Sequence, residues 1–386
     1  MNLASELPAI EAQPEPAARL RVAFFSDAFP ERNGTGAYYH DLIPQLAGRL
    51  EAVEVFQPRD DGRRPLLSIA MPGDPGQRLV TPSATSIRQR LDQLRPDVIV
   101  VVTPGLYGLL GVWEARRRRA ALLSAFHTDF EQLARMYWNP VSRFFVNLVL
   151  RTANRIVCRA GRCVLINNGS LRSEVERLGA SAVEVIGTPL DSEFLNRPLR
   201  PISGQLRRVC FAGRLAPEKN VEHIVAAAAL LPEIDFVIAG DGPLRADLAA
   251  SAARCRNVRF TGWLSREDLI DLVDEASLLL LPSAFETFGS VALESMARGR
   301  PALVSTRAGI HAWPALRDGL FALESPEHIA DALRELGRLK EVEWEKRSQA
   351  ARRAAEALNA QTLDHWEALL ARHAAQHPFN GNAADA

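Results

Sequence analysis

Short apolar runs alternate with longer amphipathic stretches along most of the chain. The runs are rich in β-branched and aromatic residues, which is typical of buried strands, and the stretches between them repeat with helical spacing. We predict strands at 21–26, 53–56, 97–102, 121–126, 208–211, 235–239, 278–281 and 301–305. We predict helices at 37–50, 86–94 and 142–160, and further helices that start at Asn220, Pro243, Arg266 and Gly289. Such alternation predicts parallel sheets with helices on both faces.

The alternating pattern occurs twice. Between the two occurrences lies segment 189–205, which contains Pro198, Pro201 and Gly204 and is the best candidate for an interdomain linker. A chain of 386 residues also exceeds what one core usually supports. We therefore predict an α/β fold of two Rossmann-like, doubly wound parallel-sheet domains. The predicted segments are a disordered leader at 1–18, domains at 19–195 and 196–360, a C-terminal helix at 361–375 and a disordered tail at 376–386.

Composition narrows the class of protein. Hydrophobic residues make up 47% and charged residues 24% of the chain, as in ordinary globular proteins, and the formal net charge is zero. A neutral chain argues against nucleic acid as the main partner, although the front half leans basic. No apolar run approaches the roughly 20 residues that span a bilayer, and the leader lacks the pattern of a signal peptide. The four cysteines show no metal-binding spacing, so we expect reduced thiols, no metal and a cytoplasmic location.

Three segments of the second half end an apolar run abruptly in glycine or proline, with charged residues beyond. They read Gly-Arg-Leu-Ala-Pro-Glu-Lys at 213–219, Gly-Asp-Gly-Pro at 240–243, and Pro-Ser-Ala-Phe-Glu-Thr-Phe-Gly at 282–289, followed by Glu294. The carboxyl ends of parallel strands share one edge of a sheet, and ligands of such folds bind there. We therefore expect the chemistry at that edge.

These motifs, in this order, resemble those of the GT-B glycosyltransferases, specifically the retaining glycosyltransferase family 4. Upstream, Phe-Pro-Glu-Arg-Asn-Gly-Thr-Gly at 29–36, Phe-His-Thr-Asp-Phe at 126–130 and Ile-Gly-Thr-Pro-Leu-Asp-Ser-Glu-Phe at 186–194 are similar to the first half of that family. The resemblance implies two domains that face across a cleft, and a C-terminal helix that crosses back to the N-terminal domain. It also implies transfer of a hexose from GDP-mannose or a UDP-hexose to a lipid-linked, glycolipid or polysaccharide acceptor, with no cofactor and no metal.

The cationic loop after the 208–211 strand suits a diphosphate. Negative charge grows on the diphosphate as the glycosidic bond breaks, so cations and amide donors are needed where that charge develops. Arg214 and Lys219 lie on this loop, before a helix whose N-terminus adds partial positive charge. Lys219 is one of only three lysines in the chain. A solvated loop between a strand and a helix is the alternative interpretation.

Two glutamates flank the start of the helix that follows Gly289. Glu286 precedes that helix and Glu294 lies roughly one and a half turns into it. Carboxylates accept paired hydrogen bonds from vicinal hydroxyls, and the resemblance assigns Glu286, as a catalytic residue, to the transferred sugar and Glu294 to the ribose. Without the other motifs, both would be read as solvated charges on a surface helix.

Backbone groups are the other expected donor ligands. The amides of Phe288, Gly289 and Ser290 stand at a helix N-terminus. Upstream, Gly34, Thr35 and Gly36 precede the first long helix, and glycines let the backbone approach a ligand closely. A plain turn and helix cap is the alternative there. Contacts to the nucleotide base are expected from the loop that contains Gly262 and Leu264.

His127 follows the apolar run 121–126 and is therefore expected at the end of a strand. The resemblance makes it a catalytic residue that contacts the sugar or a carbonyl near the reacting centre. An isolated histidine after a strand is more often a structural hydrogen-bonding group, so spacing by itself favours the structural role.

Two basic segments bear on the acceptor. Residues 116–119 are four consecutive arginines, and the predicted helix 142–160 combines apolar residues with Arg143, Arg151, Arg155 and Arg159. A helix of this kind can rest on an anionic membrane, so peripheral contact with its inner face stays open. The alternative is an apolar face in the core with solvated arginines.

The sequence thus predicts a retaining hexosyltransferase. Two rival functions remain. A catalytically silent nucleotide-sugar-binding or assembly subunit would tolerate loss of Glu286 or Lys219, and both are present. A sugar-nucleotide epimerase of the same architecture would need an acid and a base at the sugar, whereas only His127 stands out.

Overall fold

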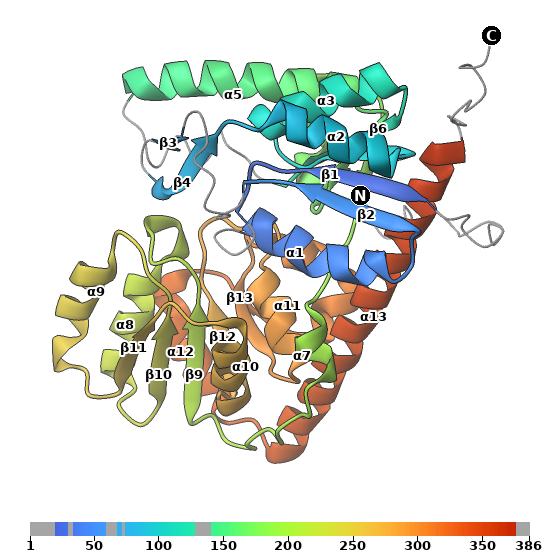
Figure 1. Cartoon of the computed structure of the whole chain (residues 1–386). Helices are drawn as coiled ribbons and strands as arrows, with labels where there is room; N and C mark the ends of the chain where they lie inside the picture. The colour runs from blue at the N-terminus through green and yellow to red at the C-terminus, as the bar shows by residue number, and fades with distance from the viewer. Residues whose placement is uncertain (1–19, 30–33, 59–67, 72–73, 128–139, 376–386) are drawn as a thin grey trace, which may run out of the picture. The chain divides into compact units, whose positions relative to one another are not determined.

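A computed structural model of the chain describes residues 20–29, 34–58, 68–71, 74–127 and 140–375 (Figure 1). It divides into two compact units. The first unit comprises residues 1–189 and 361–386, and the second comprises Leu190–Ala360. The predicted leader at 1–18 and tail at 376–386 lie outside the described residues.

The first unit is built on a parallel sheet of six strands in the order β2-β1-β5-β6-β7-β8. Its strands are β1 (Arg21–Phe25), β2 (Ala52–Phe56), β5 (Val98–Val101), β6 (Ala121–Phe126), β7 (Cys163–Ile166) and β8 (Val183–Val185). A two-stranded antiparallel hairpin, β3 (Ser68–Met71) with β4 (Asp74–Val80), is separate from this sheet. Its main helices are α1 (Gly34–Ala47), α2 (Ala84–Leu94), α3 (Leu106–Arg118), α5 (Pro140–Ala160) and α6 (Arg172–Leu178).

Alternate residues of each strand supply the two faces of this sheet. In β1, Val22 and Phe24 pack on one face with α1 and the end of the last helix, whereas Ala23 and Phe25 pack on the other with α2 and α3. Figure 1 shows α2, α3 and α5 on the side of the sheet opposite α1. Both faces of the central strands are therefore covered, which explains why these strands are continuous apolar runs.

The second unit repeats the design with a parallel sheet in the order β11-β10-β9-β12-β13-β14. Its strands are β9 (Arg208–Ala212), β10 (Asp235–Ala239), β11 (Val258–Gly262), β12 (Leu278–Leu281), β13 (Ala302–Ser305) and β14 (Leu320–Leu323). Its helices are α7 (Ser192–Asn196), α8 (Val221–Leu230), α9 (Arg245–Ser251), α10 (Arg266–Glu275), α11 (Ser290–Ala297) and α12 (Ile329–Leu336). One face packs against α10 and α11, and the other against α8, α9 and α12.

The C-terminal helix is longer than predicted. We expected a helix at 361–375, whereas α13 runs without a break over Glu341–Ala375. Its residues up to 360 belong to the second unit and those from Gln361 to the first. In the first unit, Trp366 and Leu370 are fully buried in the core, and the Trp366 indole donates to the Tyr38 hydroxyl at 3.0 Å.

The predicted linker is an integral part of the second unit. It contains α7, whose Phe194 is fully buried, and two buried arginines hold its backbone. Arg298 pairs with Asp274 at 2.8 Å and donates to the carbonyl oxygens of Phe194, Arg197 and Pro198. Arg300 donates at 2.9 Å to the carbonyl oxygen of Arg200. The prolines and glycine therefore mark an extended segment bound to the domain surface, not a free connection.

Candidate active site

Two glycine motifs of the second unit pack backbone against backbone at the carboxyl edge of its sheet. Gly240 has a φ of +123°, and a Cβ there would lie 1.9 Å from the carbonyl oxygen of Gly213. A Cβ on Gly242 would lie 2.4 Å from the carbonyl oxygen of Leu215. The backbone amide of Leu215 donates to the carbonyl oxygen of Asp241 at 2.9 Å. Only glycine fits these two positions, so the motif after β10 holds the Arg214 loop in place.

The loop after β9 is joined to the loop after β12. The side-chain amide of Asn220 donates to the carbonyl oxygen of Pro282 at 2.9 Å, and the amide of Ala284 donates to that of Glu218 at 2.8 Å. Lys219 ends the 3₁₀ turn Pro217–Lys219, and its ammonium forms an ion pair with the carboxylate of Glu286. The two residues thus meet although 67 positions separate them.

The Glu286 segment is held from its other side by the loop after β13. The amide of Gly309 donates to the carbonyl oxygen of Glu286 at 3.0 Å, and that of Ile310 donates to Phe288 at 2.8 Å. The Phe288 ring is buried in the core, edge-on to Trp313. Phe288 can therefore contact a ligand through its backbone but not through its ring.

Gly289 turns the chain into α11 with a φ of +103°, which glycine adopts without strain. Ser290 is the first residue of this helix. The first amides of an α-helix have no partner within the helix and attract anions. This helix N-terminus is three residues from Glu286, so an amide cluster and the Lys219–Glu286 pair occupy the same edge of the sheet.

Glu294 is buried within α11 and pairs with a residue that the sequence analysis did not single out. Arg266, the first residue of α10, donates to its carboxylate at 2.9 Å and lies 3.9 Å from the carboxylate of Asp191. Arg266 thereby fixes the direction of the Glu294 carboxylate.

Gly262 ends β11 with a φ of +79°, and among the described residues no heavy atom beyond its chain neighbours lies within 4 Å of the position that a Cβ would take. Its carbonyl oxygen accepts from the amide of Gly240 at 2.7 Å. Leu264 is half-buried against the core, and Trp263 between them is 63% exposed. The loop therefore presents open backbone beside an exposed aromatic ring.

In the first unit, His127 follows the end of β6 and is buried against α1. Its Nε2 lies 2.9 Å from the hydroxyl of Tyr39, and the ring centroids of His127 and Tyr38 are 4.7 Å apart. Its Nδ1 has no hydrogen-bond partner among the described residues. Burial lowers the pKa of His127 to about 4, so the imidazole is neutral at pH 7.

Gly34, Thr35 and Gly36 form the first turn of α1, which begins three residues before the predicted start at 37. Gly34 is exposed and Gly36 is buried. These three residues, which we expected in a loop before the helix, thus form its N-terminus, and backbone amides at a helix N-terminus are suited to bind an anion.

Comparison with known proteins identifies the family of this chain. The model for glycosyl transferases group 1 matches residues 195–357, and that for glycosyltransferase family 4 matches residues 32–194. The chain is 31% identical over 291 residues to the GDP-mannose-dependent alpha-(1-6)-phosphatidylinositol dimannoside mannosyltransferase of Mycobacterium tuberculosis, covering 72% of this chain and 74% of the relative. This chain belongs to glycosyltransferase family 4. It is a hexosyltransferase that uses a nucleotide-sugar donor.

Solved structures agree with the GT-B fold of this family 4 enzyme. Sucrose-phosphate synthase from Thermosynechococcus elongatus aligns with a TM-score of 0.70 at 18% identity, covering 92% of this chain and 98% of that one. The Anabaena protein HepE, solved with UDP and glucose, aligns with a TM-score of 0.65 at 18% identity, covering 91% and 100%. Within the described residues of the glycosyltransferase, no helix has the length and apolarity needed to cross a bilayer.

Proposed function

We propose that this glycosyltransferase transfers a hexose with retention of configuration from GDP-mannose, with a UDP-hexose as the second choice, to a hydroxyl of a lipid-linked, glycolipid or polysaccharide acceptor. The mycobacterial relative supports the choice of donor and of acceptor class. That enzyme is named as a GDP-mannose-dependent phosphatidylinositol dimannoside mannosyltransferase.

The observation that carries the proposal is the ion pair between Lys219 and Glu286. Each side chain is mostly buried, with 17% and 19% of its surface exposed, and each neutralises the other in the free protein. A nucleotide sugar offers a partner to both, since its diphosphate is an anion and its sugar hydroxyls are donors. We infer that the donor separates the pair, so that Lys219 binds phosphate and Glu286 binds the sugar.

Arg214, Lys219 and the amides of Phe288, Gly289 and Ser290, at the N-terminus of α11, would then stabilise the departing diphosphate. The acceptor hydroxyl attacks on the face that the diphosphate leaves, and a phosphate oxygen takes its proton. This scheme uses no enzymic nucleophile and assigns no role to a metal.

Glu294 is proposed to accept hydrogen bonds from the ribose hydroxyls while Arg266 holds its carboxylate. Gly262 and Leu264 would contact the base through their backbone. In the first unit, the α1 amides at Gly34, Thr35 and Gly36 would bind phosphate. Because His127 is neutral at pH 7, its proposed role is to orient a sugar hydroxyl or carbonyl by hydrogen bonding.

We also propose that α5 rests on an anionic membrane. Leu148, Val149 and Ile156 are 55%, 67% and 42% exposed, and the same side of the helix carries the exposed Arg155 and Arg159. The buried residues Ala153, Val157 and Cys158 form its opposite side. An apolar strip flanked by arginines suits a surface of acidic lipids. The side chains of 140–146 lie outside the described residues.

The test replaces the two members of the ion pair. In a transfer assay with GDP-mannose and UDP-hexoses, Lys219→Ala and Glu286→Ala should each lower kcat by about a hundredfold or more, because each removes a group that acts on the transition state. Lys346→Ala, an exposed lysine of the same unit, is the matched control. NMR of the product reports the anomeric configuration.

Unchanged turnover in folded Lys219→Ala and Glu286→Ala proteins would remove the proposed site. A product of inverted configuration would refute same-face attack. Donor binding without turnover on any acceptor would instead indicate a silent binding subunit.

A further inference from the structure

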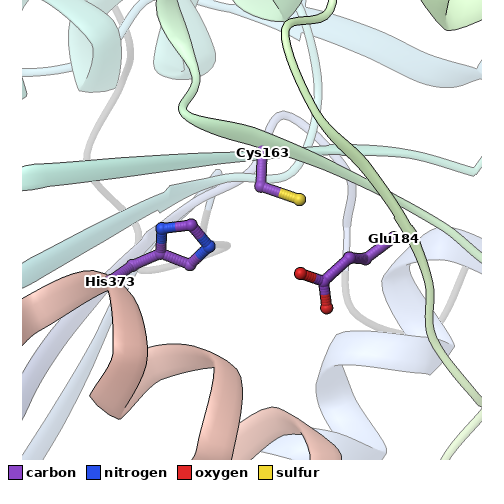
Figure 2. A group of neighbouring side chains, drawn as sticks. All are labelled: Cys163, Glu184 and His373. Carbon is purple, nitrogen blue, oxygen red and sulfur yellow. The ribbon is translucent and has the colours of Figure 1, made fainter. Parts of the chain in front are cut away.

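Cys163, Glu184 and His373 converge in the first unit, and none of them has a role in the proposed transfer. Cys163 begins β7 and Glu184 lies on the neighbouring strand β8, while His373 is in the last turn of α13. One potential ligand atom from each, the Cys163 Sγ, a Glu184 carboxylate oxygen and a His373 ring nitrogen, all lie within 4.8 Å of one another. Figure 2 shows the three side chains directed into a common space.

His373 is the observation that needs an explanation. Only 8% of the residue is exposed, and neither Nδ1 nor Nε2 has a hydrogen-bond partner among the described residues. Leaving a buried polar group without a partner is unfavourable, so native proteins rarely do so. Cys163 beside it is fully buried, and its Sγ makes a long contact of 3.9 Å with the carbonyl oxygen of Val164.

We propose that Cys163, Glu184 and His373 bind a zinc ion. Thiolate, imidazole and carboxylate are the three kinds of side-chain ligand that Zn²⁺ takes in proteins. With bonds of about 2.0–2.3 Å, tetrahedral ligand atoms stand roughly 3.3–3.6 Å apart. The observed separations of at most 4.8 Å exceed that spacing by no more than about 1.5 Å.

The charges of the cluster suit a divalent cation. The Cys163 thiolate, formed when the thiol proton passes to solvent, and the Glu184 carboxylate together offset the two charges of the ion. Glu184 also accepts from Arg372 at 2.9 Å and from the His365 Nε2 at 3.1 Å. Because a carboxylate offers about four lone-pair positions, these bonds leave room for a metal and would orient the ligand.

The position of the cluster gives a metal ion access from solvent and places the ion at the end of α13. One quarter of the Glu184 side chain is exposed, so an ion can arrive from that side and keep a water as its fourth ligand. The ion would join two strands to the end of α13. Since the three ligands come together only in the folded unit, its binding energy would stabilise the docked helix.

Titration of the reduced, full-length protein with Co²⁺, followed by Zn²⁺, tests the proposal. We expect a sulfur-to-cobalt charge-transfer band that saturates at one ion per chain, loss of that band on addition of Zn²⁺, and a higher thermal midpoint with Zn²⁺. Cys163→Ser should abolish the band, and His373→Gln should weaken binding at least about tenfold.

Matched controls separate ligation from folding. Cys158→Ser removes another buried thiol of the same unit, and Cys255→Ser removes a half-buried thiol from the second unit. Both variants should retain the band. If Cys163→Ser does not fold, His373→Gln still tests the site with the thiol intact. A missing band in the wild-type protein, or a band and affinity unchanged in the folded Cys163→Ser and His373→Gln variants, would overturn the proposal.

Discussion

His127 is enclosed by the rings of Tyr38 and Tyr39, and its imidazole is held neutral by burial. In an unfolded chain its pKa would return to about 6.5. At pH values between the folded pKa of about 4 and the unfolded pKa of about 6.5, His127 binds more protons in the unfolded state than in the folded state. The free energy of unfolding of the first unit should therefore fall as the pH is lowered from about 6.5 to 4.

We expect His127 to account for a loss of about 2 kcal/mol between pH 7 and pH 5. His127→Gln should remove that part of the pH dependence, because glutamine does not titrate. Hydrogen exchange of the β6 amides at both pH values measures the opening free energy. The exposed His328 provides the control variant, His328→Gln. An equal pH dependence in wild type and His127→Gln would contradict the burial argument.

At this scale the sequence does not indicate which residues become partners in the fold. Lys219 and Glu286 were both proposed for donor binding, but their ion pair depends on loops that are 67 positions apart. Arg266 was not proposed because nothing local links it to Glu294, although an arginine at the first position of a helix beside a binding loop is a usable signal. Cys163 and His373 meet only through the path of α13.

Among the elements, α5 has an exposed apolar side that its neighbours leave uncovered in the first unit. If this side contacts acidic lipid, a charge there should weaken binding, since burying a carboxylate beside anionic headgroups is unfavourable. Val149→Asp should lower binding to vesicles of anionic lipid by about tenfold or more. Cosedimentation measures the bound fraction.

Val342→Asp is the matched control for this experiment, because Val342 on α13 is 65% exposed against 67% for Val149. It should bind vesicles like the wild type. Equal losses in both variants, or no binding by the wild-type protein, would argue that α5 faces solvent only.

Strands β7, β8, β11 and β14 were not predicted from the sequence, but the strands that were predicted match the structure more closely than the predicted linker does. The bounds of β6, β10 and β12 match the apolar runs from which they were predicted, since buried parallel strands are apolar throughout. The segment 189–205 was read as a linker, whereas Arg298 and Arg300 bind its carbonyl oxygens. Every residue has a carbonyl oxygen, so the sequence of the segment carries no sign of that contact.

In the molecule as a whole, α13 contributes to both units. Removal of residues 361–386 would take Leu363, Trp366, Leu369 and Leu370 from the core of the first unit. At about 1.5–3 kcal/mol for each side chain, the loss approaches the entire stability of a typical domain. We expect the first unit of this truncated chain to unfold while residues 190–360 stay folded.

Limited proteolysis checks this expectation. Cleavage should be confined to the first unit of the chain that ends at 360, whereas a chain that ends at 375 should resist like the full protein. A protected first unit in the shorter chain would show that its core does not need the helix.

The same helix has a consequence for the order of events during synthesis. Leu363 to Ala374 are among the last described residues to leave the ribosome, yet they cover strands that were made first. Residues 190–360 supply the second core without them. Nascent domains usually fold from the N-terminus onward. Here the later domain can finish first, and the earlier one must wait with part of an apolar sheet face uncovered, which would make the nascent chain a client for chaperones that bind such surfaces.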